Sequence, residues 1–205
     1  MKPVRIVIMA KAPQAGLAKT RLIPALGASG AARLAARMLQ HTLKQAVAAG
    51  LGPVELCRTP PDASAWQRIA LPAKLSLSEQ GDGDLGARMD RVAARTIAAG
   101  ESLLLIGTDC PALNAAALKE IATSLCYADA VMVPATDGGY VALALKRYDK
   151  GLFDDIAWST ASVAAAQRDR IMQRDWSLTL LPALRDIDEP LDLHHLPAGW
   201  IRPRV

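Results

Sequence analysis

The chain contains few aromatic residues and few cysteines, and each shortage excludes a class of protein. Only one Phe and three Tyr among 205 residues argue against a platform on which a single-stranded nucleic acid would stack. Its three cysteines are odd in number and show no Cys-x-x-Cys spacing. The sequence therefore predicts neither a disulfide framework nor a structural zinc site, and we expect a protein of the reducing cytoplasm.

Long hydrophobic runs and a strong charge imbalance are also missing. No apolar run approaches the length of a membrane-spanning helix. The short run 4–9 is followed by Lys11 and lacks a cleavage-site pattern, so we expect a buried strand and not a signal peptide. The net charge of +4 is spread along the chain, which favours a local site for an anionic ligand over a nucleic-acid-binding surface. Length and composition predict one globular domain over residues 1–205.

What the chain does contain is a regular alternation of strand-like and helix-like segments. Strands are expected at 4–9, 53–57, 74–78, 103–107, 130–135, 140–146 and 176–182. Helices are expected between Ser29 and Gly50, over 61–70, along 85–96, from Asn114 to Leu125 and near 160–174. This pattern predicts an α/β three-layer sandwich with a mainly parallel sheet. Ligands of such sheets bind beyond the carboxyl ends of the strands, so polar residues that follow strands are the candidates for a site.

The loop after the first strand carries Lys11, Gly16, Lys19 and Arg21. Cations and free backbone N–H groups at the end of a strand are typical of a site for nucleotide phosphates. A solvated basic turn is the alternative. The loop is not a P-loop, because Ala18 stands where that motif requires a glycine before the lysine.

Two further loops follow predicted strands. The loop Gln80–Gly86 formally contains Gly-x-Gly-x-x-Gly, but Asp82 and Asp84 would repel a pyrophosphate, so a turn and helix cap are expected there. In Gly-Thr-Asp-Cys-Pro (107–111), Asp109 follows the most apolar strand and is placed to hold Mg²⁺ with nucleotide phosphates. An Asx turn closed by the proline is the alternative for Asp109.

The segment Thr-Asp-Gly-Gly-Tyr (136–140) lies between two closely spaced strands. Asp-Gly is an ordinary hairpin signal. The second glycine would also allow the backbone to approach a substrate closely.

Six blocks occur in fixed order between residues 4 and 194: AKAPQAGLAKTRL, QGDGDLGARM, GTDCPAL, TDGGYVALAL, FDDIAWST and DIDEPLDL. Together they resemble the bacterial family of glycosyltransferase A-like proteins long labelled as a domain of unknown function. The resemblance implies a nucleotide-diphospho-sugar transferase fold, related to guanylyltransferase and molybdenum-cofactor nucleotidyltransferases. It also implies binding of nucleotide phosphates by Lys11, Gly16, Lys19 and Arg21.

The resemblance assigns roles to two carboxylates. Asp109 corresponds to the strand-end metal ligand and, with Lys19, to the catalytic group. Asp188, in DIDEP after the strand-like segment 184–187, corresponds to a second carboxylate on the same Mg²⁺ or Mn²⁺. The alternative for Asp188 is an N-cap of the following PLDLHH segment.

The resemblance also implies an acceptor side formed by Asp137, Gly138, Gly139 and Trp158. A place in the core is the alternative for Trp158, as is usual for large aromatic residues.

The implied function is a metal-dependent transferase that uses a nucleotide-diphospho-sugar donor and a small-molecule acceptor. A nucleotidyltransferase that releases pyrophosphate is the first alternative, because Mg²⁺ with Lys and Arg would stabilise the negative charge of either reaction. A non-catalytic nucleotide-binding module is the second alternative.

Two departures from the relatives are visible: the opening loop has a single glycine, and Thr-Asp-Cys-Pro replaces Asp-x-Asp. Neither nucleic acid nor membrane is an expected partner.

The sequence indicates no nucleophile or base. His41 lies in a helical pattern and His194 and His195 lie near the end, so solvated or structural roles are expected. Cys110 adjoins Asp109, but without a placed histidine it is not expected to act as a nucleophile.

Overall fold

The computed structural model describes residues 3–201 and contains a seven-stranded sheet in the order β3-β2-β1-β4-β6-β5-β7. Its strands are β1 Val4–Lys11, β2 Val54–Thr59, β3 Leu75–Glu79, β4 Ser102–Ile106, β5 Ala130–Pro134, β6 Tyr140–Leu145 and β7 Leu178–Leu180. Every pairing is parallel except those of β6, which is antiparallel to β4 and β5. The mainly parallel sheet expected from the sequence is confirmed.

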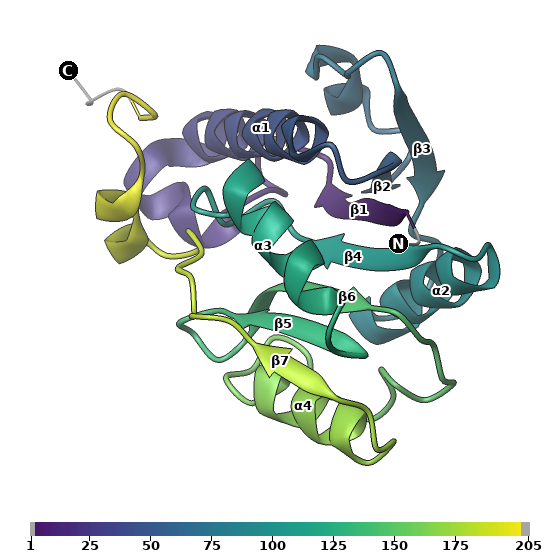
Figure 1. Cartoon of the computed structure of the whole chain (residues 1–205). Helices are drawn as coiled ribbons and strands as arrows, with labels where there is room; N and C mark the ends of the chain where they lie inside the picture. The colour runs from purple at the N-terminus through teal and green to yellow at the C-terminus, as the bar shows by residue number, and fades with distance from the viewer. Residues whose placement is uncertain (1–2, 202–205) are drawn as a thin grey trace.

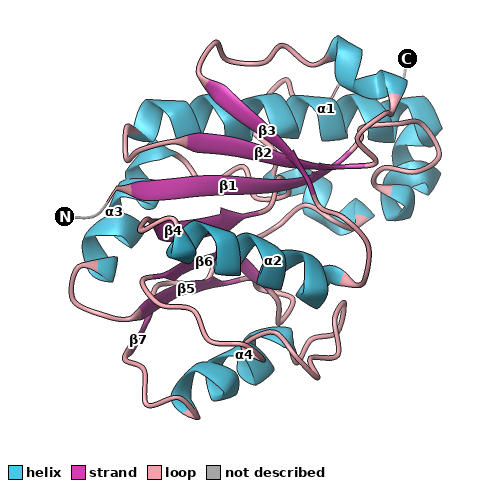
Figure 2. Ribbon diagram, turned by 90° about the vertical axis from the view of Figure 1, so that its right-hand side faces the viewer, coloured by secondary structure: helices cyan, strands magenta, loops and turns pink. Residues whose placement is uncertain are grey.

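Helices cover both faces of the sheet, which confirms the three layers (Figure 1). The long helices are α1 Ile23–Ala49, α2 Leu85–Ala98, α3 Ala115–Leu125 and α4 Val163–Met172. Leu43 of α1 and Ile121 of α3 join Ile8 of β1 in one core cluster, whereas Met89 of α2 and Ile171 of α4 belong to the cluster on the other face. In Figure 2, α2 lies in front of the sheet and α1 behind it. Because both faces are covered, a strand such as β4 is buried along its whole length and is apolar after Ser102.

Local signals fix several helix ends where the sequence places them. Gly50 ends α1 in the left-handed conformation, with φ 65°. The Asn114 side chain accepts hydrogen bonds from the backbone N–H groups of the first turn of α3. Asp84 caps α2 by accepting from Ala87 N at 2.9 Å. The loop before α2 is therefore a turn and helix cap, as predicted.

Three expectations are wrong in extent. Helix α1 begins at Ile23 and not near Ser29, because Pro24 starts a first turn that the non-helical Gly27 (φ 71°) separates from the rest. The segment 61–70 forms only a 3-10 helix, Ser64–Arg68. The strand-like segment before Asp188 forms a single bridge, between Leu184 and Ala135.

The alternative of an N-cap role for Asp188 is also wrong. The cap of the 3-10 helix Pro190–His195 is Glu189, whose side chain forms a capping box with Asp192. Asp188 instead belongs to an extended segment that runs from β7 back along the ends of β5 and β4 toward α1 (Figure 1). This path places the Asp188 side chain at the carboxyl ends of the strands.

Within residues 3–201, no helix is long and apolar enough to cross a membrane.

Candidate functional site

A cleft of about 690 Å³ lies at the carboxyl ends of β1 and β4. These two strands are neighbours although β2 and β3 lie between them in the chain, because the chain builds one side of the sheet and then crosses to the other. Ligands of open α/β sheets bind at such a switch point. The volume falls in the usual range for small-molecule sites, roughly 300–1,000 Å³.

Lys19 lies at the centre of the ion pairs on one wall of this cleft. Its side chain is only 6% exposed, and its Nζ lies 2.9 Å from Asp109 Oδ1 and 3.4 Å from Asp188 Oδ1. It also donates a hydrogen bond to the carbonyl oxygen of Ile187 at 2.5 Å. The loop after β1, the loop after β4 and the late extended segment are thus joined through one ammonium group.

Backbone contacts also hold the loop after β4 against the late extended segment. Ile187 N donates to the carbonyl oxygen of Asp109 at 2.8 Å, and the Ile187 side chain is buried against α1. Lys19 has φ 51°, the left-handed conformation that a residue with a side chain seldom adopts. Such backbone strain is found most often at functional sites.

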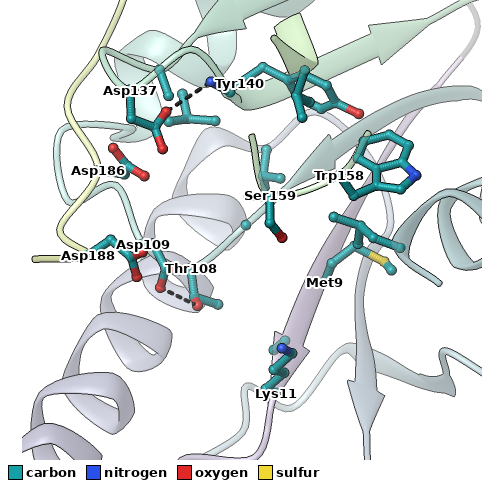
Figure 3. Close-up of a pocket in the computed structure, with 18 of the residues that line it drawn as sticks. Met9, Lys11, Thr108, Asp109, Asp137, Tyr140, Trp158, Ser159, Asp186 and Asp188 are labelled. Carbon is teal, nitrogen blue, oxygen red and sulfur yellow. Dashed lines mark hydrogen bonds between the residues drawn. The ribbon is translucent and has the colours of Figure 1, made fainter. Parts of the chain in front are cut away.

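The other predicted phosphate-binding residues are placed differently. The Arg21 guanidinium pairs with Asp188 Oδ2 at 2.5 Å and is 59% exposed. Lys11, at the end of β1, is exposed, lines the cleft and lies apart from the labelled carboxylates in Figure 3. Gly16 has φ 82° but is not among the residues that line the cleft. The structure therefore brings three of these four residues to the cleft.

Four carboxylates, those of Asp109, Asp137, Asp186 and Asp188, lie along one side of the cleft (Figure 3). Asp186 is absent from the residues that the sequence singles out. Burial, the charge of Asp137 and the charge of Asp188 raise its pKa above the usual aspartate value. The Asp-x-Asp spacing around buried Ile187 is the signal that could have found it, since alternate residues of an extended segment face the same side.

The predicted acceptor residues surround the turn between β5 and β6. Asp137 Oδ1 accepts from Gly139 N at 2.9 Å, and both residues line the cleft. Gly138 (φ 94°) lies against the loop that carries Trp158, where a Cβ atom would come within 2.0 Å of the Ala161 carbonyl oxygen. Gly138 thus allows two loops to meet, without lining the cleft itself.

An apolar wall faces the cleft from the side of Trp158. The indole lines the cleft and also packs against the core, so its place in the core is confirmed, while its contact with an acceptor stays a prediction. Gly86 makes room for it, because a Cβ atom there would lie 2.7 Å from the indole Nε1. Tyr140 and Met9 lie nearby (Figure 3). Burial raises the pKa of the Tyr140 phenol, so this group stays protonated and is no base. Burial likewise raises the pKa of the Cys110 thiol, which disfavours a nucleophilic thiolate.

The carboxylates fit a divalent cation that is shared with a bound phosphate ligand. Among the described residues, no group of three or more His, Cys, Asp and Glu side chains is placed to hold a metal ion. Asp109 Oδ1 and Asp188 Oδ1 nevertheless reach one cation already, the ammonium of Lys19. Carboxylate oxygens are the donors that Mg²⁺ and Mn²⁺ prefer, and Mg²⁺ is usually held by one or two carboxylates together with substrate phosphates.

Comparison with known proteins agrees with this fold. A proposed nucleotide-diphospho-sugar transferase from Desulfovibrio desulfuricans is 26% identical, with a TM-score of 0.84 over 92% of this chain and 84% of that chain. Rv0371c from Mycobacterium tuberculosis is 17% identical, with a TM-score of 0.58 over 95% and 97%. A 4-diphosphocytidyl-2C-methyl-D-erythritol synthase from Anaerococcus prevotii is 10% identical, with a TM-score of 0.63 over 95% and 96%.

No curated protein matches the chain in sequence. Residues 42–160, more than half of the chain, match the family model described as "Uncharacterized protein conserved in bacteria (DUF2064)". The chain therefore belongs to this family, and its fold is that of the nucleotide-diphospho-sugar transferases.

Proposed function

We propose that the protein is a metal-dependent transferase that uses a nucleotide-diphospho-sugar as its donor. The observation that carries this proposal is the convergence of Asp109 and Asp188 on one cation position in a cleft that Lys11 and Arg21 also line. A diphosphate needs such a combination of fixed cations and hard oxygen ligands. The likeness to the proposed sugar transferase of Desulfovibrio desulfuricans supports the choice of donor.

In this proposal Lys11, Lys19 and Arg21 bind the donor phosphates, and Gly16 shapes the loop that carries the last two. Asp109 and Asp188 hold Mg²⁺ or Mn²⁺; Rv0371c, which shares the fold, has been solved in complex with manganese. The divalent ion, when bound, neutralises charge on the phosphate oxygens. The lysine and arginine side chains also stabilise the negative charge that builds up on the departing diphosphate.

The acceptor binds between the Trp158 ring and Asp137, which lie on the two sides of the cleft (Figure 3). The Trp158 ring offers an apolar surface, and the Asp137 carboxylate, held by Gly139 N, offers a hydrogen-bond acceptor. Gly138 contributes by letting the loop of Trp158 approach this turn closely. We assign proton abstraction from the acceptor hydroxyl to Asp186. It lines the cleft beside Asp137, and burial and the neighbouring carboxylates raise its pKa above the usual aspartate value, which favours its holding a proton.

Nucleotidyl transfer is the second candidate. The fold is shared with the 4-diphosphocytidyl-2C-methyl-D-erythritol synthase and with a CMP:2-keto-3-deoxy-manno-octonic acid synthetase solved with CTP, the latter 13% identical with a TM-score of 0.53. The same cations and carboxylates would then serve attack at the α-phosphorus of a nucleoside triphosphate. The released product, pyrophosphate in place of a nucleoside diphosphate, distinguishes the two reactions.

A ligand screen tests the proposal directly. Nucleotide-sugars and nucleoside triphosphates are compared by thermal shift, with and without Mg²⁺, and the ligands that bind are then offered with small-molecule acceptors. We expect Mg²⁺-dependent stabilisation by a nucleotide-sugar and release of the nucleoside diphosphate. Release of pyrophosphate would select the second candidate, and binding without turnover would indicate a binding module. Failure of every nucleotide to bind would overturn the proposal.

A further inference from the structure

We propose that Lys19 is a built-in competitor of the metal: its ammonium occupies the cation position between Asp109 and Asp188, and leaves it for the ligand phosphate when the divalent ion binds. This inference rests on the proposed function and adds an exchange of cations to it. It predicts that metal and phosphate bind together far better than either binds alone.

The first argument is that the two cations exclude each other. Lys19 Nζ lies 2.9 Å from Asp109 Oδ1 and 3.4 Å from Asp188 Oδ1. A divalent ion bound to these same oxygens would lie about 2.0–2.6 Å from each. The ion and the ammonium would then be neighbours in a partly desolvated place, where like charges repel strongly. One of them has to leave.

The second argument concerns the burial of Lys19. Its side chain is 6% exposed, so the ammonium has exchanged its water for Asp109, Asp188 and the Ile187 carbonyl oxygen. Leaving it buried without an anionic partner would be costly. Its four-carbon stem is flexible, and the cleft lined by Lys11 and Arg21 is next to it. A bound phosphate offers the displaced ammonium a new partner, which couples the two binding events.

Arg21 shows why the exchange is specific to Lys19. Its guanidinium contacts only the far oxygen, Oδ2, of Asp188 and is 59% exposed. It therefore remains hydrated, and a divalent ion on the Oδ1 atoms does not have to displace it. Lys11 lines the same cleft away from the carboxylates (Figure 3) and serves as the matched control cation.

The test compares wild type, Lys19→Met and Lys11→Met by calorimetry, with Mn²⁺ alone, inorganic pyrophosphate alone, and the two together. For Lys19→Met we expect Mn²⁺ alone to bind at least about tenfold more tightly than to wild type, because a neighbouring positive charge has been removed. Pyrophosphate alone should bind more weakly. Lys11→Met should weaken pyrophosphate binding but leave the Mn²⁺ affinity close to that of wild type. A purely structural role of Lys19 predicts weaker binding of both ligands, and that outcome would overturn the inference.

A second measurement uses wild type only and does not depend on how the variant folds. Limiting acetic anhydride labels exposed lysines, and peptide mass spectrometry reads the extent at Lys19, with exposed Lys44 on α1 as the internal control. Mn²⁺ should increase labelling of Lys19, and Mn²⁺ with pyrophosphate should decrease it again. Unchanged labelling while calorimetry detects bound Mn²⁺ would refute the exchange alone. Absence of Mn²⁺ binding under all conditions would overturn the proposed metal requirement, and the exchange with it.

Discussion

Two clusters of this molecule each join two basic and two acidic side chains, and they lie in different surroundings. One comprises Arg5, Glu55, Arg95 and Glu101, with Ser78 donating to Glu55. The other comprises Lys19, Arg21, Asp109 and Asp188. Members of the first cluster are held largely on β1, β2, β3 and α2, and none lines the cleft. Members of the second lie outside the sheet and the long helices.

The exposure of the acidic partners separates the two clusters further. Glu55 is 3% exposed, whereas Asp109 and Asp188 are 47% and 36% exposed. Burial alone would raise the pKa of Glu55, but hydrogen bonds from Arg95 and Ser78 and the nearby arginine charges hold it below the usual value. In the first cluster the carboxylate is enclosed, and in the second it is open to a ligand. Similar charges therefore stabilise the fold in one place and form a binding wall in the other.

The largest effect is expected for Glu55→Gln, which breaks the first cluster. It leaves two arginines without their shared carboxylate, and loss of one partner of a buried ion pair costs about 3 kcal/mol of unfolding free energy. Urea denaturation measures this loss. Nucleotide binding of the folded variant should not change. A marked loss of binding would contradict the division between a structural cluster and a site.

For Asp109→Asn in the second cluster we expect the opposite pattern. Loss of one ligand charge at the proposed metal position should lower kcat/KM by about 100-fold, as removal of one electrostatic contact to a transition state often does. The unfolding free energy should change little, because Asp109 is half exposed and Lys19 keeps Asp188 and the Ile187 carbonyl oxygen as partners. Initial rates with the donor found by screening, together with urea denaturation, check both statements. Glu120→Gln on the exposed side of α3 is the matched control.

A smaller effect is expected for Arg21→Ala. Because Arg21 is exposed at the rim of the cleft, its removal should weaken nucleotide binding by about 1 kcal/mol, near fivefold. The difference from wild type should shrink as salt increases, since exposed charges are screened. Calorimetry at two salt concentrations measures it. A difference that does not depend on salt would mean that Arg21 is enclosed when the ligand is bound.

The smallest effect on stability is expected for Asp186→Asn and depends on pH. The folded-state pKa of Asp186 is raised, so its ionised form is disfavoured by folding at neutral pH. The variant should therefore have a slightly higher Tm than wild type at pH 7. This gain should disappear as the pH falls below the unfolded aspartate value of about 3.9, where wild type is protonated as well. The ionised form of Glu55 has the opposite effect on stability. Its pKa is lowered in the folded protein, so ionised Glu55 stabilises the fold at neutral pH, and this stability is lost only in acid.

The opposite pH behaviour of the two carboxylates is measurable by thermal unfolding between pH 3 and 7. The stability gap between wild type and Glu55→Gln should be full above the unfolded glutamate pKa of about 4.3 and should narrow as the pH falls through the lower folded value. A gap for Glu55 that widens in acid would show that the arginines do not stabilise its ionised form.

The sequence by itself determined most elements of the fold and several of their ends. Apolar runs and helical periods marked the sheet, and Asn114 and Gly50 marked helix ends, because these signals act over a few neighbouring residues. It also brought Lys11, Lys19, Arg21 and Asp109 forward as candidates, because polar groups after parallel strands collect at one edge of the sheet. The start of α1 was missed because the non-helical Gly27 interrupts the helical period, although Pro24 in the first turn is a local signal for a helix start.

Only the tertiary structure decided which charges meet. Lys19 pairs with Asp188, 169 residues away in the chain, and no local pattern encodes that contact. Nor could spacing show that Lys19 is buried in its ion pairs while Lys11 is exposed, or that Asp186 joins Asp137 on the acidic wall. The physical reason is that burial and Coulomb interactions depend on distances in space. The path of the segment after β7 sets those distances, because it crosses the ends of β5 and β4 and is held there by the hydrogen bond from Ile187 N to the Asp109 carbonyl oxygen.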